Sequence, residues 1–275
     1  MLTQYGEPNH LNTNMTDTKR KELIRDLIES GSEITGGAIS SAIGFFAAGP
    51  IGAAVLGAGG AAASVALMHV GNELSERLLG PREKMRIGAT LAFAAKEIDE
   101  RIKNGENIRS DSFFEKKGSN RSGAEELAES VLLRTQRETE EKKVPLLAHL
   151  LANISFKPEI SVALGEQMIK ATDLLTYRQL CILRIGTIKD RSSLRQIDYH
   201  EQKTFTRDLY QVLHECLDLY NRGFIRIGSS AVLGMTDINP SQLEIQGLGV
   251  DLHNWMQLWK IPNSDIAPVV AVLSI

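Results

Sequence analysis

Residues 34–72 read ITGGAISSAIGFFAAGPIGAAVLGAGGAAASVALMHVGN, which is 39 residues without one acidic or basic side chain. Gly49-Pro50 lies near the middle, and an X-Pro bond at this place favours a break or a tight turn. The pattern predicts a hydrophobic helical hairpin with arms at 34–49 and 51–70. At a rise of about 1.5 Å per residue the arms span roughly 24 and 30 Å, against a bilayer hydrocarbon core of about 30 Å.

Basic residues flank the hairpin on both sides, which would keep both of its ends on the cytoplasmic face of a membrane. They are Lys19, Arg20, Lys21 and Arg25 before it, and Arg77, Arg82, Lys84 and Arg86 after it. The Leu, Ile and Val residues of the second arm together contribute roughly −2 to −4 kcal/mol on an insertion scale. Glycines, Ser64 and His69 oppose insertion, so we expect it to be conditional rather than constitutive.

Small residues recur at nearly every fourth position from Gly36 to Ser64, and Leu56 is the exception. Such a stripe lets helices approach closely, and in membranes it drives oligomerisation, so we expect a homo-oligomer. The residues predicted to carry membrane contact and oligomerisation are Gly44, Phe45, Phe46, Ala48, Gly52, Val55, Leu56, Gly60, Ser64 and Leu67. The alternative is that the hairpin forms the buried centre of a soluble helical bundle.

In its composition the segment resembles the glycine-zipper stretches of pore-forming toxins and effectors, and the hydrophobic hairpin of colicin-type proteins. The overall plan resembles bacterial membrane effectors of the anti-phage defence or toxin type. This resemblance implies a protein that acts on the inner membrane after a trigger, and the sequence names no trigger.

The chain around the hairpin predicts amphipathic helices, which together make a helical domain over 18–175. Gly80-Pro81 begins a helix with apolar residues on one face, and Asn104-Gly105 ends it. Ser122-Gly-Ala-Glu125 is a capping box, which predicts a helix from there to about Lys142. Pro145 and Pro158 are each placed to begin a further helix.

The order of elements changes at about Thr176, and residues 176–275 resemble a winged-helix domain. The predicted elements are a helix at 177–188, a long helix at about 201–220, strands at 224–227 and 242–245, and a helix from about Gly247. The runs LDLYNRGFIRI and QLEIQGLGVDLHNWM carry the resemblance. Acidic side chains balance the basic ones over this part, so it lacks the basic surface that DNA binding requires. Protein partner binding is the better expectation, through Lys203, Arg207, Trp255 and Trp259. For the two tryptophans, a place in the core is the favoured alternative.

Catalytic and metal-binding patterns are missing from the sequence, so we expect a protein that is not an enzyme and that needs no cofactor or metal. The six histidines are scattered, and no pair of them has metal-ligand spacing. The two cysteines, Cys181 and Cys216, fall on apolar helical faces and are better interpreted as core residues of a protein in a reducing compartment.

These observations predict a mainly α protein, with a helical bundle around the Gly/Ala-rich hairpin and a C-terminal winged-helix-like α+β domain. Residues 1–17 are polar, lack a signal-peptide pattern and are expected to form a disordered tail. The expected location is the cytoplasm, with conditional or peripheral association with the inner membrane. The favoured hypothesis is a conditional membrane-perturbing or pore-forming effector that its C-terminal domain regulates. The alternative is a soluble helical adaptor or regulator that binds a protein partner, with DNA as the less favoured ligand.

Overall fold

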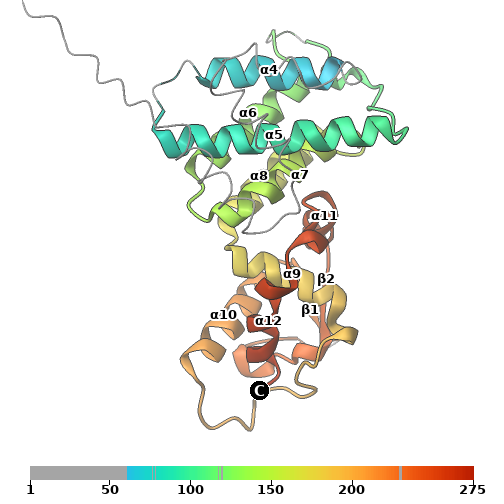
Figure 1. Ribbon diagram of the computed structural model, residues 1–275. Helices are drawn as coiled ribbons and strands as arrows, with labels where there is room; N and C mark the ends of the chain where they lie inside the picture. Colours follow the sequence, from blue (N-terminus) through green and yellow to red (C-terminus); the bar gives the residue numbers. More distant parts are fainter. Residues whose placement is uncertain (1–60, 76, 78, 117, 119, 229–230) are drawn as a thin grey trace, which may run out of the picture.

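The computed structural model describes residues 61–275 except 76, 78, 117, 119 and 229–230, in two stacked parts (Figure 1). The predicted tail at 1–17 and most of the predicted hairpin therefore lie outside the described residues. The first part contains the helices α4 (Ala61–Ser75), α5 (Pro81–Lys103), α6 (Gly123–Arg137), α7 (Val144–Ile154) and α8 (Val162–Leu174), with the 3-10 turns η2 (Ser112–Phe114) and η3 (Glu141–Lys143).

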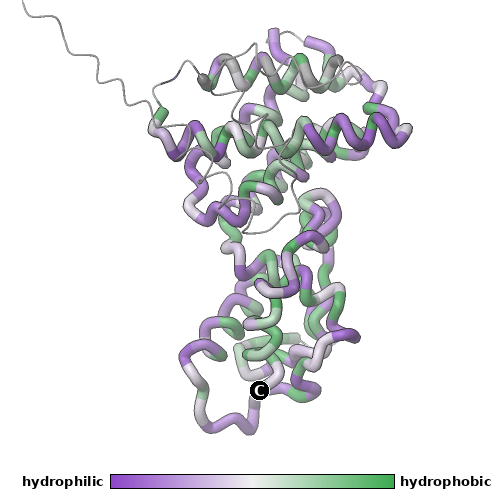
Figure 2. The backbone as a smooth tube through the Cα atoms, in the orientation of Figure 1, coloured by the Kyte–Doolittle hydropathy of each residue, from purple (hydrophilic) through white to green (hydrophobic). Residues whose placement is uncertain are grey.

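Helix α5 is the centre of the first part, because eight consecutive residues from Ile87 to Ala94 are all buried. A helix that is buried on every side has no polar stripe to present to water, and the middle of α5 is accordingly apolar (Figure 2). Helices α4, α6 and α7 pack against it. Its last turns carry charged side chains and lie at the hydrophilic end of the helix in Figure 2.

Local capping explains where these helices begin. Pro81 occupies the first turn of α5, and the Ser122 hydroxyl accepts a hydrogen bond from the Glu125 backbone N–H at the start of α6. The predicted capping box is therefore confirmed, although α6 ends at Arg137 rather than near Lys142. Helix α8 begins after Ser161, whose hydroxyl caps it, and not at Pro158 as predicted.

The described residues of the second part form four helices and a small antiparallel sheet. Its elements are α9 (Tyr177–Ile188), η4 (Lys189–Arg191), α10 (Arg207–Asn221), β1 (Ile225–Ile227), η5 (Met235–Asp237), η6 (Pro240–Gln242), β2 (Leu243–Ile245), α11 (Leu248–Trp255), η7 (Leu258–Lys260) and α12 (Asn263–Leu273). The two strands pair with Ile225 opposite Ile245. Gly249 is required at the start of α11, because a Cβ there would lie 2.1 Å from the backbone oxygen of Phe224.

The mainly helical fold is confirmed for the described residues, and the predicted winged-helix domain is not. The predicted strands pair as expected, but each has only three residues. The helix predicted from about Glu201 begins at Arg207 instead, because the Thr206 hydroxyl caps it by accepting from the Leu209 N–H. Residues 192–206 are an irregular connection with bends and a turn, so the long helix expected before the strands is shorter.

Candidate functional site: the cleft between the two parts

The predicted membrane residues can be placed only in part. Eight of them lie outside the described residues, namely Gly44, Phe45, Phe46, Ala48, Gly52, Val55, Leu56 and Gly60. Ser64 lies on α4, and Leu67 on the same helix is 8% exposed and belongs to the core. No helix in the described part of the chain combines the length and the apolar character that crossing a bilayer requires.

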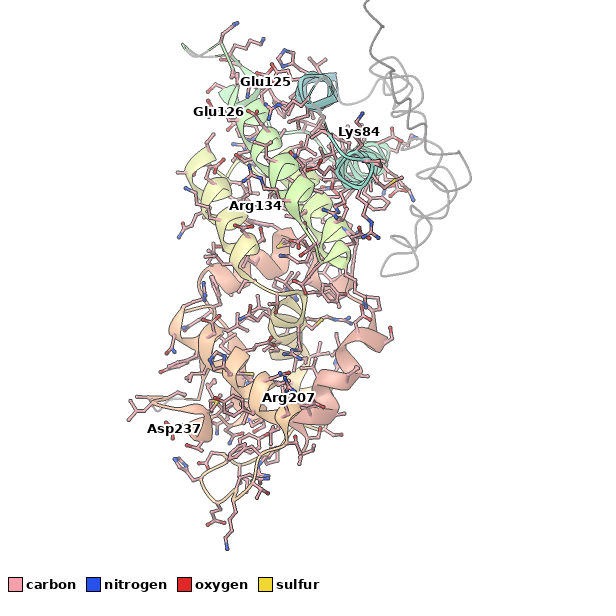
Figure 3. The ribbon with its side chains drawn as sticks, turned by 90° about the vertical axis from the view of Figure 1, so that its left-hand side faces the viewer. Lys84, Glu125, Glu126, Arg134, Arg207 and Asp237 are labelled. Carbon is pink, nitrogen blue, oxygen red and sulfur yellow. The ribbon has the colours of Figure 1, made fainter. Side chains whose placement is uncertain are left out.

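Ion pairs hold α4 against α6. Helix α4 contains the last residues of the charge-free segment. Arg121 pairs with both Glu73 on α4 and Glu129 on α6, and Arg77 Nη2 lies 2.9 Å from Glu129. His69 Nδ1 lies 3.2 Å from Glu125, which Figure 3 shows on α6 beside α4. The Arg121 and Arg77 ion pairs together form an ionic clamp at one end of the bundle.

The four predicted partner residues separate into two groups. Lys203 and Arg207 are exposed around the start of α10, and Figure 3 places Arg207 on the second part, away from the bundle helix that carries Arg134. Trp255 and Trp259 both line an open cleft of about 720 Å³ between the parts. The last turns of α5, the region around the end of α7, and the segment from α11 through η7 form its walls.

A buried carboxylate, that of Glu97 on α5, lies at this cleft and joins three elements. Glu97 Oε1 accepts a hydrogen bond from the Gln257 side-chain amide, and Oε2 pairs with Nδ1 of His149 on α7. Burial alone would raise the pKa of Glu97, but the hydrogen bond and the electrostatic attraction of His149, with the Lys260 cation and the Gln257 amide, together hold that pKa below its ordinary value. Because Glu97 is ionised, His149 donates from Nδ1.

The contact of Glu97 with His149 and Gln257 is called the joint between the two parts. Gln257 has an unusual backbone conformation at this joint. Its φ is +53° and its ψ is 50°, which is the left-handed region that costs a non-glycine residue roughly 1–2 kcal/mol. The side chain is 8% exposed, and its amide reaches from the second part into the first to meet Glu97. The hydrogen bond to Glu97 offsets that backbone strain, so the two parts stabilise each other at this point.

A second chain of hydrogen bonds crosses the same cleft. Arg101 Nη1 donates to Asn153 Oδ1 at 2.8 Å, and the Asn153 side-chain amide donates to the Trp255 carbonyl oxygen at 2.8 Å. Arg101 also pairs with Glu106 at 2.7 Å, and its guanidinium lies 3.8 Å from the centre of the Phe156 ring. The cleft is thus bordered by satisfied polar groups that fix α11 relative to α5 and α7.

On another side of the junction, Asp265 on α12 binds two residues near the connection between the parts. Asp265 accepts from Lys142 Nζ at 2.8 Å and from the Tyr177 hydroxyl at 2.7 Å. Burial, followed by the hydrogen bond to Asp265, raises the pKa of Tyr177. The second part is therefore held at two separate places, by Glu97 and by Asp265.

The described residues show little that would support catalysis. Burial raises the pKa of the Cys181 and Cys216 thiols to about 12, so neither is a thiolate at neutral pH. Within the described ranges, no group of three His, Cys, Asp or Glu side chains is arranged to hold a metal ion. The His149–Glu97 pair resembles the base of a hydrolytic triad, but among the described side chains no Ser, Thr or Cys hydroxyl or thiol bonds to that imidazole.

Comparisons of the chain with family models, with curated proteins and with solved structures find no significant match.

Proposed function

We propose that the protein is a conditional membrane-perturbing effector whose C-terminal part senses a signal at the cleft. Under this proposal it resides in the cytoplasm, associates conditionally with the inner membrane and acts there as a homo-oligomer, with anti-phage defence as a fitting role. The observation that carries the proposal is the placement of α4. This helix ends the charge-free segment, buries one face in the bundle and leaves Val65, on another face, 57% exposed.

The energetics of α4 support a conditional step. Leu67, Val70 and Leu74 are buried, and burial of each contributes about 1.5–3 kcal/mol relative to water. Their transfer from the bundle into water therefore costs about 5–9 kcal/mol in total. The second arm of the predicted hairpin gains only roughly 2–4 kcal/mol from its larger apolar residues in a membrane. The bundle is therefore the favoured location of α4 until a trigger lowers the cost of release.

The length of α4 limits how it acts. Its 15 residues span about 22 Å, which is shorter than a hydrocarbon core of about 30 Å. A membrane crossing by this segment would thus include residues before Ala61. The ionic clamp fits this scheme, because exposed ion pairs contribute only about 0–1 kcal/mol each and are readily exchanged for water or lipid headgroups.

The test uses Val65, because its exposure separates folding from insertion. Val65→Asp keeps an exposed position exposed and hardly alters helix propensity, but an aspartate in the middle of a membrane costs about 2.5–3.5 kcal/mol. We expect the induced wild-type chain to depolarise bacteria and to resist carbonate extraction from the membrane. Val65→Asp should abolish both effects and leave the circular dichroism spectrum unchanged.

Two matched controls complete this experiment. Val65→Thr keeps the shape without the charge and should retain membrane activity. Leu174→Asp adds the same charge at a residue of α8 that is 61% exposed, and it should also retain activity. Equal activity of Val65→Asp and the wild type would overturn the proposal.

The second candidate function is a helical adaptor that binds a protein partner, and the burial of one face of α4 in the bundle favours it. In that case the induced wild-type chain leaves the membrane potential unchanged, and all three variants behave alike.

A further inference from the structure

The chain has two tryptophans, and both line the cleft. The Trp259 side chain is half exposed, and Trp255 is partly buried. The face of an indole ring attracts ammonium and guanidinium groups, and more strongly than the smaller aromatic rings do. The cleft volume of about 720 Å³ falls within the range of small-molecule sites, about 300–1,000 Å³. The cleft thus offers aromatic surface in a space that is large enough for a ligand.

Glu97 places a fixed negative charge at this cleft, and it is only 9% exposed. Its direct hydrogen bonds come from the Gln257 amide and from the imidazole of His149. The nearest Lys and Arg cations of the described residues lie farther off, with Lys260 Nζ at 3.8 Å and Arg101 Nη1 at 3.9 Å. These separations exceed hydrogen-bond length, so the carboxylate lacks a direct hydrogen bond from a cationic Lys or Arg among the described side chains.

The two neighbouring cations differ in their freedom to move. Arg101 is fixed by Glu106, by Asn153 and by the Phe156 ring. Lys260 is 43% exposed, and its ammonium group ends a flexible four-carbon stem. Lys260 can therefore turn into solvent and vacate the place beside Glu97 at little energetic cost.

We propose that the cleft binds an organic cation, whose ammonium or guanidinium group replaces Lys260 beside Glu97 and whose stem packs on Trp255 and Trp259. This chemistry is shared by small polyamines and by a lysine or arginine side chain of a peptide. The proposal rests on the proposed function, since it names the ligand class that the C-terminal part senses. A ligand there touches the joint between the parts, because Gln257 and Lys260 belong to the same turn.

The experiment is a titration of the full chain followed by tryptophan fluorescence, which reports on the cleft alone because both tryptophans lie there. The probes are agmatine as a small cation, N-acetyl-glycyl-arginyl-glycinamide as a peptide, and glutarate as an anion of similar size. An ionic strength of about 0.15 M suppresses long-range attraction. We expect a saturable change in emission with agmatine or with the peptide, and the tighter of the two identifies the source. Glutarate should give no change.

Three variants test the positions of the charges. Glu97→Gln should weaken binding by about tenfold to a hundredfold, because it removes a charge-assisted hydrogen bond. Lys260→Ala should tighten binding, because it removes the competing cation. Asp99→Asn is the matched control on the same helix, because the Asp99 carboxylate pairs with Lys103 and does not belong to the lining of the cleft, so binding should change little. Absence of a saturable signal for both cations, unchanged binding in Glu97→Gln, or weaker binding in Lys260→Ala would each overturn the proposal.

The result is separable from the proposed function. If neither cation binds and the induced chain still depolarises bacteria, the ligand proposal fails alone. If the cations bind but the induced wild-type chain neither depolarises bacteria nor enters the membrane fraction, the membrane role fails. The binding site then stands on its own.

Discussion

Replacement of Glu97 by alanine tests the joint between the two parts. The change leaves His149 Nδ1 and the Gln257 amide without their acceptor, and both residues are buried. An unsatisfied buried donor costs about 1–3 kcal/mol, so we expect the free energy of unfolding to fall by about 2–6 kcal/mol. The assay is urea unfolding, followed by circular dichroism for the helices and by tryptophan fluorescence for the cleft.

Glu100→Ala is the matched control, because Glu100 lies on the same helix with a side chain that is 59% exposed. Exposed substitutions of this kind change stability by about 0.5 kcal/mol or less. If Glu97→Ala and Glu100→Ala unfold at the same urea concentration, the reasoning about the joint is wrong.

The pH dependence of the same joint has a definite sign. The pKa of Glu97 is lower in the folded chain than the ordinary value of 4.5, so its ionised form favours folding. This contribution is present above about pH 4.5 and is lost as the pH falls through the folded-state pKa. The difference in stability between the wild type and Glu97→Gln should therefore shrink in acid, and a difference that grows in acid would contradict the assignment.

Three further predictions concern other places in the fold. Arg121→Ala removes the residue that two ion pairs of the clamp share, so the amide hydrogens of α4 should exchange faster, while those of α5 change less. The free energy of unfolding should fall by about 1–2 kcal/mol. Equal protection of α4 in the wild type and the variant would refute the clamp. Cys181 and Cys216 should resist a thiol reagent at neutral pH until urea unfolds the chain, because both are buried with a pKa of about 12; rapid labelling of the native chain would contradict their burial. Gly249→Ala should destabilise the second part by more than about 1 kcal/mol, because the new Cβ would overlap the Phe224 backbone oxygen. A melting temperature equal to that of the wild type would show that the backbone shifts to make room for the Cβ.

Much of the helical framework could be predicted, because short-range signals determine it. Pro81, the Ser122 capping box and the apolar periodicity of α5 each act within one or two turns of their own helix. The error at α10 also has a local cause. Thr206 is a stronger helix N-cap than any signal near Glu201, and it shortens the helix that the winged-helix resemblance required.

The joint at the cleft could not be predicted in the same way, because its partners are distant in sequence. Glu97 and Gln257 are 160 residues apart, and no local pattern relates them. One signal was present in the sequence: Glu97 and Arg101 fall three and seven residues after Ala94, on the face of α5 that is otherwise apolar. A carboxylate on a buried face requires partners, so this position would have indicated a polar joint without naming the other side.

The most direct test of the account asks whether α4 leaves the bundle and enters a membrane. Val65→Cys, labelled with a polarity-sensitive dye, reports on this helix alone, since the two native cysteines are buried. The labelled chain, in the wild-type background and with Arg121→Ala, is mixed with vesicles of bacterial lipid. The account predicts that the dye stays in water in the wild-type background, and that the fraction in an apolar, quencher-protected environment rises by about fivefold to thirtyfold when Arg121 is replaced. The account would be contradicted if hydrogen exchange shows that Arg121→Ala releases α4 but the dye remains in water in both backgrounds.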